Sequence, residues 1–155
     1  MLIENKNGEQ LLEIINIEED KILQEYSPIT HALVVVKNKG KFILLYNKYR
    51  KQWEIAGGCL EQGETLRECA ERECYEEIGH AVVNTRYIGL MKFMVKANYF
   101  HNEDKIEYGA LYCADISDDI AFEENNEMKA MCLYEQGMDI GYINEIDHKL
   151  LEYYQ

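Results

Sequence analysis

One stretch of this chain, Thr65–Ile78, combines the pattern of a core-facing helix with acidic residues at positions that such a helix normally keeps apolar. At about 100° per residue, its apolar residues form one stripe that drifts around the helix. They are Leu66, Ala70, Cys74 and Ile78. Glu73 and Glu77 fall inside or beside that stripe. Because an unpaired buried carboxylate is expensive, a helix selected only for burial would not carry them there.

Three glutamates of this segment, Glu73, Glu76 and Glu77, are spaced i, i+3 and i+4, so their carboxylates can converge beside the helix. Like charges about 4 Å apart repel by roughly 1 kcal/mol per pair in water, and by several times more at a lower effective dielectric. The spacing therefore predicts a positive group among them. Carboxylate oxygens without histidine favour a hard cation such as Mg²⁺ or Mn²⁺. Arg72 offers a planar fork that can hold one carboxylate in place.

The alternative for such a segment is an ordinary solvated face of Glu and Arg. Many helices have one, and we expect Arg67, Glu68 and Glu71 to form it here. Glu73 and Glu77 fit this alternative poorly, because they lie along the apolar stripe.

Short apolar runs on both sides of the helix predict strands. The predicted strands are Leu11–Ile17, His31–Lys37, Lys41–Tyr46, Trp53–Ile55, Val82–Val95, Ile106–Ile116 and Met128–Tyr134. Asn38-Lys39-Gly40 is a hairpin signal between the second and third of them. From Ile143 onward, apolar residues return at helical spacing, which predicts a terminal helix that packs one stripe on the domain.

Composition limits the class of protein. The chain has 155 residues, 47% of them hydrophobic, and a formal net charge of −13. A chain of this size buries roughly two-thirds of its unfolded surface, so we predict a single domain over residues 1–155. The acidity argues against an extended nucleic-acid surface or binding to anionic membranes, and no apolar run reaches the ~20 residues of a membrane span. With no signal-peptide pattern at the start and no Cys-x-x-Cys among five cysteines, we expect a cytoplasmic protein with reduced thiols.

The segment Gly58 to Gly79 resembles the Nudix box, the loop-helix-loop motif of the Nudix hydrolases, in which MutT-type enzymes form one branch. Every fixed position of the motif is matched: Gly58, Glu64, Arg72, Glu73, Glu76, Glu77 and Gly79. Trp53–Gly58 is similar to the family's lead-in strand, although Ala56 replaces a common proline, and His80 stands where an aliphatic residue is usual. The resemblance implies an α/β fold, the Nudix-type α/β/α sandwich with a mixed sheet.

The same resemblance implies a metal-dependent pyrophosphohydrolase that cleaves a nucleoside diphosphate linked to another moiety, with Mg²⁺ or Mn²⁺ as cofactor. The expected metal ligands are the Gly58 carbonyl, Glu73, Glu76, Glu77 and one acidic residue of the loop before the last strand. For that residue Glu124 is the first choice and Glu127 the second. Among the catalytic residues, Glu73 and Glu77 are both candidates for the general base. Arg72 is expected to orient the carboxylates and Glu64 to support the loop.

Basic residues are concentrated just before the box. Six lie between Lys37 and Lys51, with no acidic residue among them: Lys37, Lys39, Lys41, Lys48, Arg50 and Lys51. Such a patch can attract a polyphosphate to an otherwise anionic protein, so we expect Arg50 and Lys48 to bind substrate. A merely solvated hairpin is the alternative.

Three functions remain open. The first is a pyrophosphohydrolase of nucleoside triphosphates, including oxidised ones, that releases monophosphate and pyrophosphate. The second is a hydrolase of nucleotide sugars, dinucleoside polyphosphates or capped RNA ends. The third is a catalytically silent domain that binds a nucleotide as a sensor, and the intact glutamates argue against it. The expected partner is a small-molecule nucleotide substrate, and a homodimer remains open.

Overall fold

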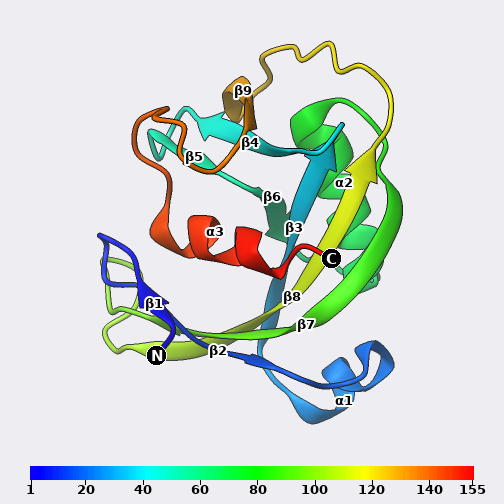
Figure 1. The fold of residues 1–155 in the computed structure, drawn as a ribbon. Helices are drawn as coiled ribbons and strands as arrows, with labels where there is room; N and C mark the ends of the chain where they lie inside the picture. Colours follow the sequence, from blue (N-terminus) through cyan, green and yellow to red (C-terminus); the bar gives the residue numbers. More distant parts are fainter.

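The computed structural model describes residues 1–155, which form one mixed sheet with helices on both faces (Figure 1). The strands are β1 (Ile3–Glu4), β2 (Gln10–Ile15), β3 (Ile29–Asn38), β4 (Lys41–Asn47), β5 (Gln52–Glu54), β6 (Ala56–Cys59), β7 (Val83–Val95), β8 (Lys105–Ile116) and β9 (Met128–Tyr134). The helices are α1 (Ile22–Glu25), α2 (Leu66–Ile78) and α3 (Glu145–Leu150), with 3₁₀ turns at Glu19–Lys21 and Leu151–Tyr153. The strand order is β1-β2-β7-β8-β3-β4-β5, and β6 and β9 pair with β3 and β4 respectively. The predicted mixed-sheet fold is confirmed.

Strand β3 lies at the centre of this sheet. It runs parallel to β8 and antiparallel to β4 and β6. Val34 and Val36 pack in the core on the side of α2, whereas Val35 packs in the core on the side of α3. Because both faces of β3 are covered, its sequence is a continuous apolar run and does not alternate with polar residues.

Local signals set the two ends of α2. Thr65 accepts from the Glu68 N–H while the Glu68 carboxylate accepts from the Thr65 N–H, which is a capping box. Gly79 ends the helix with φ 86°, a left-handed conformation that glycine adopts without strain. The apolar stripe is buried as predicted, and the cores on the two sides of the sheet place α2 opposite α3 (Figure 1).

The predicted terminal helix begins later than its apolar pattern does. Asn144 caps it by accepting from the N–H groups of Ile146 and Asp147, so the preceding Ile143 stays outside. Its Asp147 carboxylate accepts from the Ile55 N–H at 2.9 Å, which ties α3 to the chain between β5 and β6. The sequence patterns predicted neither β1 nor the helical turns between Glu19 and Glu25.

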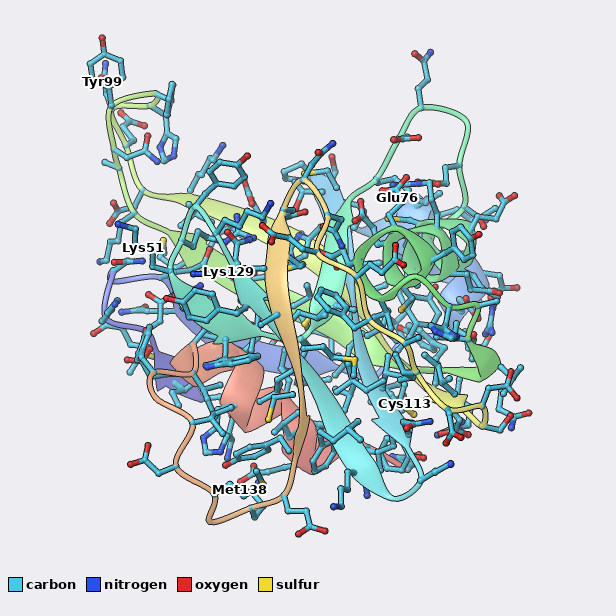
Figure 2. The ribbon with its side chains drawn as sticks, turned by 90° about the horizontal axis from the view of Figure 1, so that it is seen from above. Lys51, Glu76, Tyr99, Cys113, Lys129 and Met138 are labelled. Atoms are coloured by element: carbon cyan, nitrogen blue, oxygen red, sulfur yellow. The ribbon has the colours of Figure 1, made fainter.

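The hairpin between β7 and β8 projects from the body of the molecule, with Tyr99 near its tip (Figure 2). Tyr99 is 96% exposed, and the Lys96 and Asn98 side of this hairpin lines the main cavity described below. No helix of the chain is both long enough and apolar enough to cross a membrane.

The Asp147 carboxylate, half-buried at the cavity, predicts a pH effect on stability. Burial, with a contribution from Glu54, raises the pKa of Asp147 from 3.8 to about 8. The folded state thus holds a proton that the unfolded state has lost, and the stability from this group is full below about pH 4 and is lost as pH rises through about 8. Asp147→Asn keeps an oxygen for the Ile55 N–H but carries no charge. We expect urea unfolding to show that Asp147→Asn gains at least about 1.4 kcal/mol relative to wild type between pH 5 and pH 9.

Asp118→Asn, a substitution at an exposed residue, serves as the control and should show no such gain in stability. Equal pH dependence of unfolding in wild type and Asp147→Asn would contradict the prediction.

Candidate active site

The Arg72 guanidinium connects most of the acidic residues of the box. It binds Glu64 through two bonds, Nε–Oε2 at 2.6 Å and Nη2–Oε1 at 3.1 Å. Its Nη1 donates to Glu73 at 2.9 Å and to Glu76 at 3.2 Å, and Nη2 donates to the Cys59 carbonyl at 3.0 Å. These bonds lower the pKa of Glu64 to about 2. Arg72 therefore connects the loop before α2 with the Glu73 and Glu76 carboxylates of α2.

Glu73 lies directly against the backbone of Gly58. A Cβ atom on Gly58 would be 2.5 Å from the Glu73 carboxylate carbon, so a larger residue at this position would displace the Glu73 carboxylate. Burial raises the pKa of Glu73, Arg72 lowers it, and Glu76 and Glu127 raise it further. The contact brings the start and the middle of the box together at one place.

Glu77 is held differently, by burial and one backbone donor. Its side chain accepts from the Gly57 N–H at 2.8 Å, no lysine or arginine pairs with it, and it is 2% exposed. Burial raises its pKa to about 9, and the negative charges of Glu127, Glu73 and Glu54 contribute in the same direction. Glu77 is thus a buried acidic side chain near three other carboxylates, and it has no cationic partner of its own.

A second group of polar and charged side chains surrounds Glu54 of β5, which is 6% exposed. The Arg50 guanidinium donates to it through Nε at 2.6 Å and Nη2 at 3.0 Å, and the Gln52 and Asn47 amides donate at 2.6 and 3.2 Å. Asn47 and Arg50 also donate to Glu127, at 3.1 and 3.3 Å. Glu54 was not among the site residues predicted from the sequence, although a glutamate inside a predicted strand next to the box indicates a possible site residue.

The loop before β9 contains both candidates for a further ligand. Glu124, the first choice, is exposed and pairs with Lys48 at 2.8 Å, and this pairing lowers its pKa. Glu127, the second choice, acts electrostatically on Glu77. The Asn125 amide donates to the Glu77 carbonyl at 3.0 Å, which fixes this loop on the end of α2. The structure therefore brings Glu127 toward the box and turns Glu124 toward Lys48.

The convergence of Glu73, Glu76 and Glu77 that their spacing predicted is not found. No three His, Cys, Asp or Glu side chains are grouped closely enough to hold a metal ion. Arg72 draws Glu73 and Glu76 to itself, whereas Glu77 is turned to the Gly57 amide.

The donor set nevertheless fits a divalent cation on chemical grounds. Hard cations take oxygen ligands, and the groups beside Gly58 are carboxylates and backbone carbonyls. Burial is the main cause of the raised pKa of Glu77, and the charges of Glu127, Glu73 and Glu54 add to it. Glu73 and Glu77, with Glu127 behind them, are therefore the residues that best suit such an ion.

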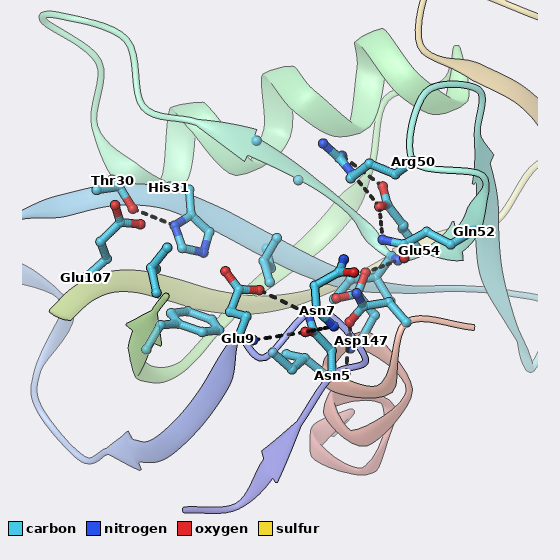
Figure 3. A pocket seen from close by; sticks show the side chains of 18 of the residues that line it. Asn5, Asn7, Glu9, Thr30, His31, Arg50, Gln52, Glu54, Glu107 and Asp147 are labelled. Atoms are coloured by element: carbon cyan, nitrogen blue, oxygen red, sulfur yellow. Dashed lines mark hydrogen bonds and ion pairs between the residues drawn. The ribbon is translucent and has the colours of Figure 1, made fainter. Parts of the chain in front are cut away.

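A cavity of about 670 Å³ adjoins this group. Gly57, Gly58 and Cys59 line the side next to the box. Arg50, Gln52 and Glu54 lie at one end of the cavity, His31 and Glu107 lie at the other, and Glu9 and Asn5 lie between them (Figure 3). The cavity is in the size range of sites for small ligands. Of the two residues expected to bind substrate, Arg50 lines the cavity and Lys48 does not.

Relatives of known sequence match parts of this chain. The NAD-capped RNA hydrolase NudC of Vibrio vulnificus is 33% identical over 99 residues, which cover 56% of this chain and 37% of that protein. The uncharacterized Nudix hydrolase YvcI of Bacillus subtilis is 34% identical over 62 residues, covering 40% of this chain and 39% of that protein. The chain thus spans well under half the length of these relatives.

Solved structures share the fold. The Bacillus subtilis pyrophosphohydrolase BsRppH superposes with a TM-score of 0.64 at 22% identity, covering 93% of this chain and 85% of that one. The MutT NUDIX hydrolase of Burkholderia pseudomallei gives 0.67 at 18% identity, covering 84% of this chain and 100% of that one. At these identities the likeness concerns the fold alone. The NUDIX domain model matches residues 27–152, which is most of the chain, and the chain therefore belongs to the Nudix family.

Proposed function

We propose that this chain is a metal-dependent nucleotide pyrophosphohydrolase that cleaves a phosphoanhydride bond of a nucleoside triphosphate. One observation carries the proposal: Glu77 is buried without a cationic partner and accepts from the N–H of Gly57, a residue that lines a cavity large enough for a nucleotide. A structural role alone does not explain a group that is so costly to bury. The names of the NudC, BsRppH and MutT proteins, all hydrolases, support the same reaction class.

In this proposal the Gly58 carbonyl, Glu73 and Glu77 would hold Mg²⁺ or Mn²⁺, with Glu127 assisting in place of Glu124 and with Glu76 kept nearby by Arg72. The bound cation neutralises phosphate charge and lowers the pKa of water. Arg72 holds the Glu73 and Glu76 side chains in place. Glu64 binds the other edge of the Arg72 guanidinium.

Glu73 and Glu77 are the candidates for taking the proton of the attacking water. The Gly57 N–H fixes the direction of the Glu77 carboxylate, and Arg72 fixes that of Glu73. Arg50 lies at the cavity and can contact a phosphate, although Glu54 holds two of its nitrogens. Lys48 can act on the phosphates only through its charge and from a distance, because its ammonium group pairs with Glu124.

Hydrolysis of capped RNA ends is the second candidate, favoured by the similarity to proteins named NAD-capped RNA hydrolase. A silent sensor domain is the third. It predicts nucleotide binding without turnover.

The first test is metal-dependent turnover. Pyrophosphate release from a panel of nucleoside triphosphates should require Mg²⁺ or Mn²⁺ and stop in EDTA. Glu73→Gln and Glu77→Gln should each lower kcat at least about tenfold, or about 1.4 kcal/mol in the barrier, because each replaces a carboxylate oxygen of the proposed cation site with an amide nitrogen. Glu71→Gln, on the exposed face of the same helix, is the matched control and should retain full activity. Full activity in EDTA, or in both test variants, would refute the proposal.

A second test separates the two loop glutamates. Because Glu127 acts on Glu73 and Glu77 while Glu124 pairs with Lys48, Glu127→Gln should raise the Mg²⁺ concentration for half-maximal activity at least about threefold. Glu124→Gln should leave this concentration within experimental error. Titration of Mg²⁺ at saturating nucleotide measures both. The reverse order of effects would assign the ligand role to Glu124.

A further inference from the structure

Glu54 of β5 is a buried carboxylate at the cavity on which Arg50 and Gln52 converge (Figure 3). Each of its oxygens accepts from two nitrogens. Oε1 accepts from Asn47 at 3.2 Å and from Arg50 Nη2 at 3.0 Å, and Oε2 accepts from Gln52 and from Arg50 Nε, both at 2.6 Å. A carboxylate has about four lone-pair sites, so none is left for a ligand. Glu54 can therefore serve the site only through the groups that it holds.

The turn between β4 and β5 does not depend on this carboxylate. The Asn47 side chain accepts from the N–H groups of Tyr49 and Arg50, both at 2.9 Å, and the Asn47 carbonyl accepts from the Lys51 N–H at 2.8 Å. Asparagine commonly fixes a turn in this way. Replacing a buried ion pair by apolar residues is often neutral or stabilising, so holding the turn does not account for a buried charge at Glu54.

The bonds to Glu54 fix one edge of the Arg50 guanidinium and leave the other edge open. Nε and Nη2 donate to Glu54, and Nη2 also donates to Glu127 at 3.3 Å, whereas Nη1 donates to no group of the protein. The Arg50 side chain is 58% exposed, and the residue lines the cavity. Because a guanidinium is planar and rigid, holding Nε and Nη2 also sets the direction of Nη1.

The anchor of Arg50 lies close to the box along the chain. Glu54 precedes Gly57 by three residues, and the Gly57 N–H donates to Glu77 at 2.8 Å. Three residues of extended chain span roughly 10 Å. The charge of Glu54 also contributes to the raised pKa of Glu77. Glu54 thus holds Arg50 within reach of a ligand that is bound at the box.

We propose that Glu54 is a positioning residue, which holds Arg50 so that Nη1 donates to a phosphate group of the bound nucleotide. This assignment rests on the proposed nucleotide hydrolysis and gives both residues a role in it. The ion pair reduces the long-range attraction of Arg50 for an anion, but its side chain gives up rotamer freedom before the nucleotide arrives. A charged donor that is already in place binds an oxyanion more tightly than the same donor on a mobile side chain.

The test measures the binding of inorganic tripolyphosphate to the full chain by calorimetry in excess Mg²⁺. This probe carries phosphate groups without a base, so base specificity does not affect the result. Arg50→Ala should raise the Kd at least about fivefold, because one charge-assisted hydrogen bond is lost. Glu54→Gln should raise it by a similar factor, because the amide puts a donor where Arg50 or Gln52 needs an acceptor. The double variant should bind no more weakly than Arg50→Ala, since Glu54 acts through Arg50.

Two further variants separate positioning from charge and from stability. Arg50→Lys keeps the charge but lacks the fork, so its Kd should lie within about twofold of that of Arg50→Ala. Asp115→Asn is the matched control. It breaks another arginine–carboxylate pair, Arg86 with Asp115 at 3.0 Å, outside the lining of the cavity, and should leave the Kd unchanged. For a nucleoside triphosphate that the chain hydrolyses, Glu54→Gln should raise KM and keep kcat within about twofold.

The outcomes distinguish this inference from the proposed function. Weaker tripolyphosphate binding in both single variants, with no further loss in the double variant, supports the inference even if no triphosphate is hydrolysed, a result that would reject the proposed function. Metal-dependent hydrolysis with an unchanged Kd in Glu54→Gln overturns the inference and leaves the function standing. Losses of Glu54→Gln and Arg50→Ala that multiply in the double variant also overturn it, because Glu54 would then act independently of Arg50. Absence of tripolyphosphate binding by the wild-type chain has the same consequence.

Discussion

The contacts of Arg72 are the interaction on which the rest of the site depends. Three carboxylates within one and a half turns of helix would repel one another by about 1 kcal/mol or more per close pair. A single guanidinium offers five N–H donors in a fixed plane, and here it serves Glu64, Glu73 and Glu76 together with the Cys59 carbonyl. A lysine could not hold these groups in one plane, because its ammonium is a point charge on a flexible stem. The loop before α2 and the acidic face of α2 therefore form one rigid unit.

Sequence patterns predicted those parts of the molecule that local rules determine. The ends of α2 follow from Thr65, Glu68 and Gly79, and β9 occupies the predicted residues Met128–Tyr134. The turns between Glu19 and Glu25 had no local signal. They are held by distant partners, since Glu19 accepts from Arg67 of α2 and from the Tyr112 hydroxyl of β8. Such contacts leave no periodicity in the sequence.

The same distinction separates the predicted from the unpredicted site residues. Glu73 and Glu77 carry a local contradiction, acidic residues on an apolar stripe, and so were identified from the sequence. Glu9, Glu107 and Asp147 reach the cavity only through strand pairing and the docking of α3, so nothing near them in the sequence marks them. The choice between Glu124 and Glu127 depended on one turn. The Asn125 side chain accepts from the N–H groups of Glu127 and Met128, and this turn places Glu127 toward Asn47 and Arg50.

The charge pairs around the cavity also change the role of the basic segment before the box. The sequence suggested that its lysines and arginine draw in a polyphosphate. In the structure Arg50 is bound by Glu54 and Glu127, and Lys48 by Glu124, so much of their charge is already balanced. On a chain of net charge −13, these residues alone leave little positive potential for a triphosphate. Glu77, by contrast, is buried without a cationic partner of its own. If the proposed cation binds beside Glu77, it would also supply the positive charge that the phosphates need, so the two binding events would be coupled.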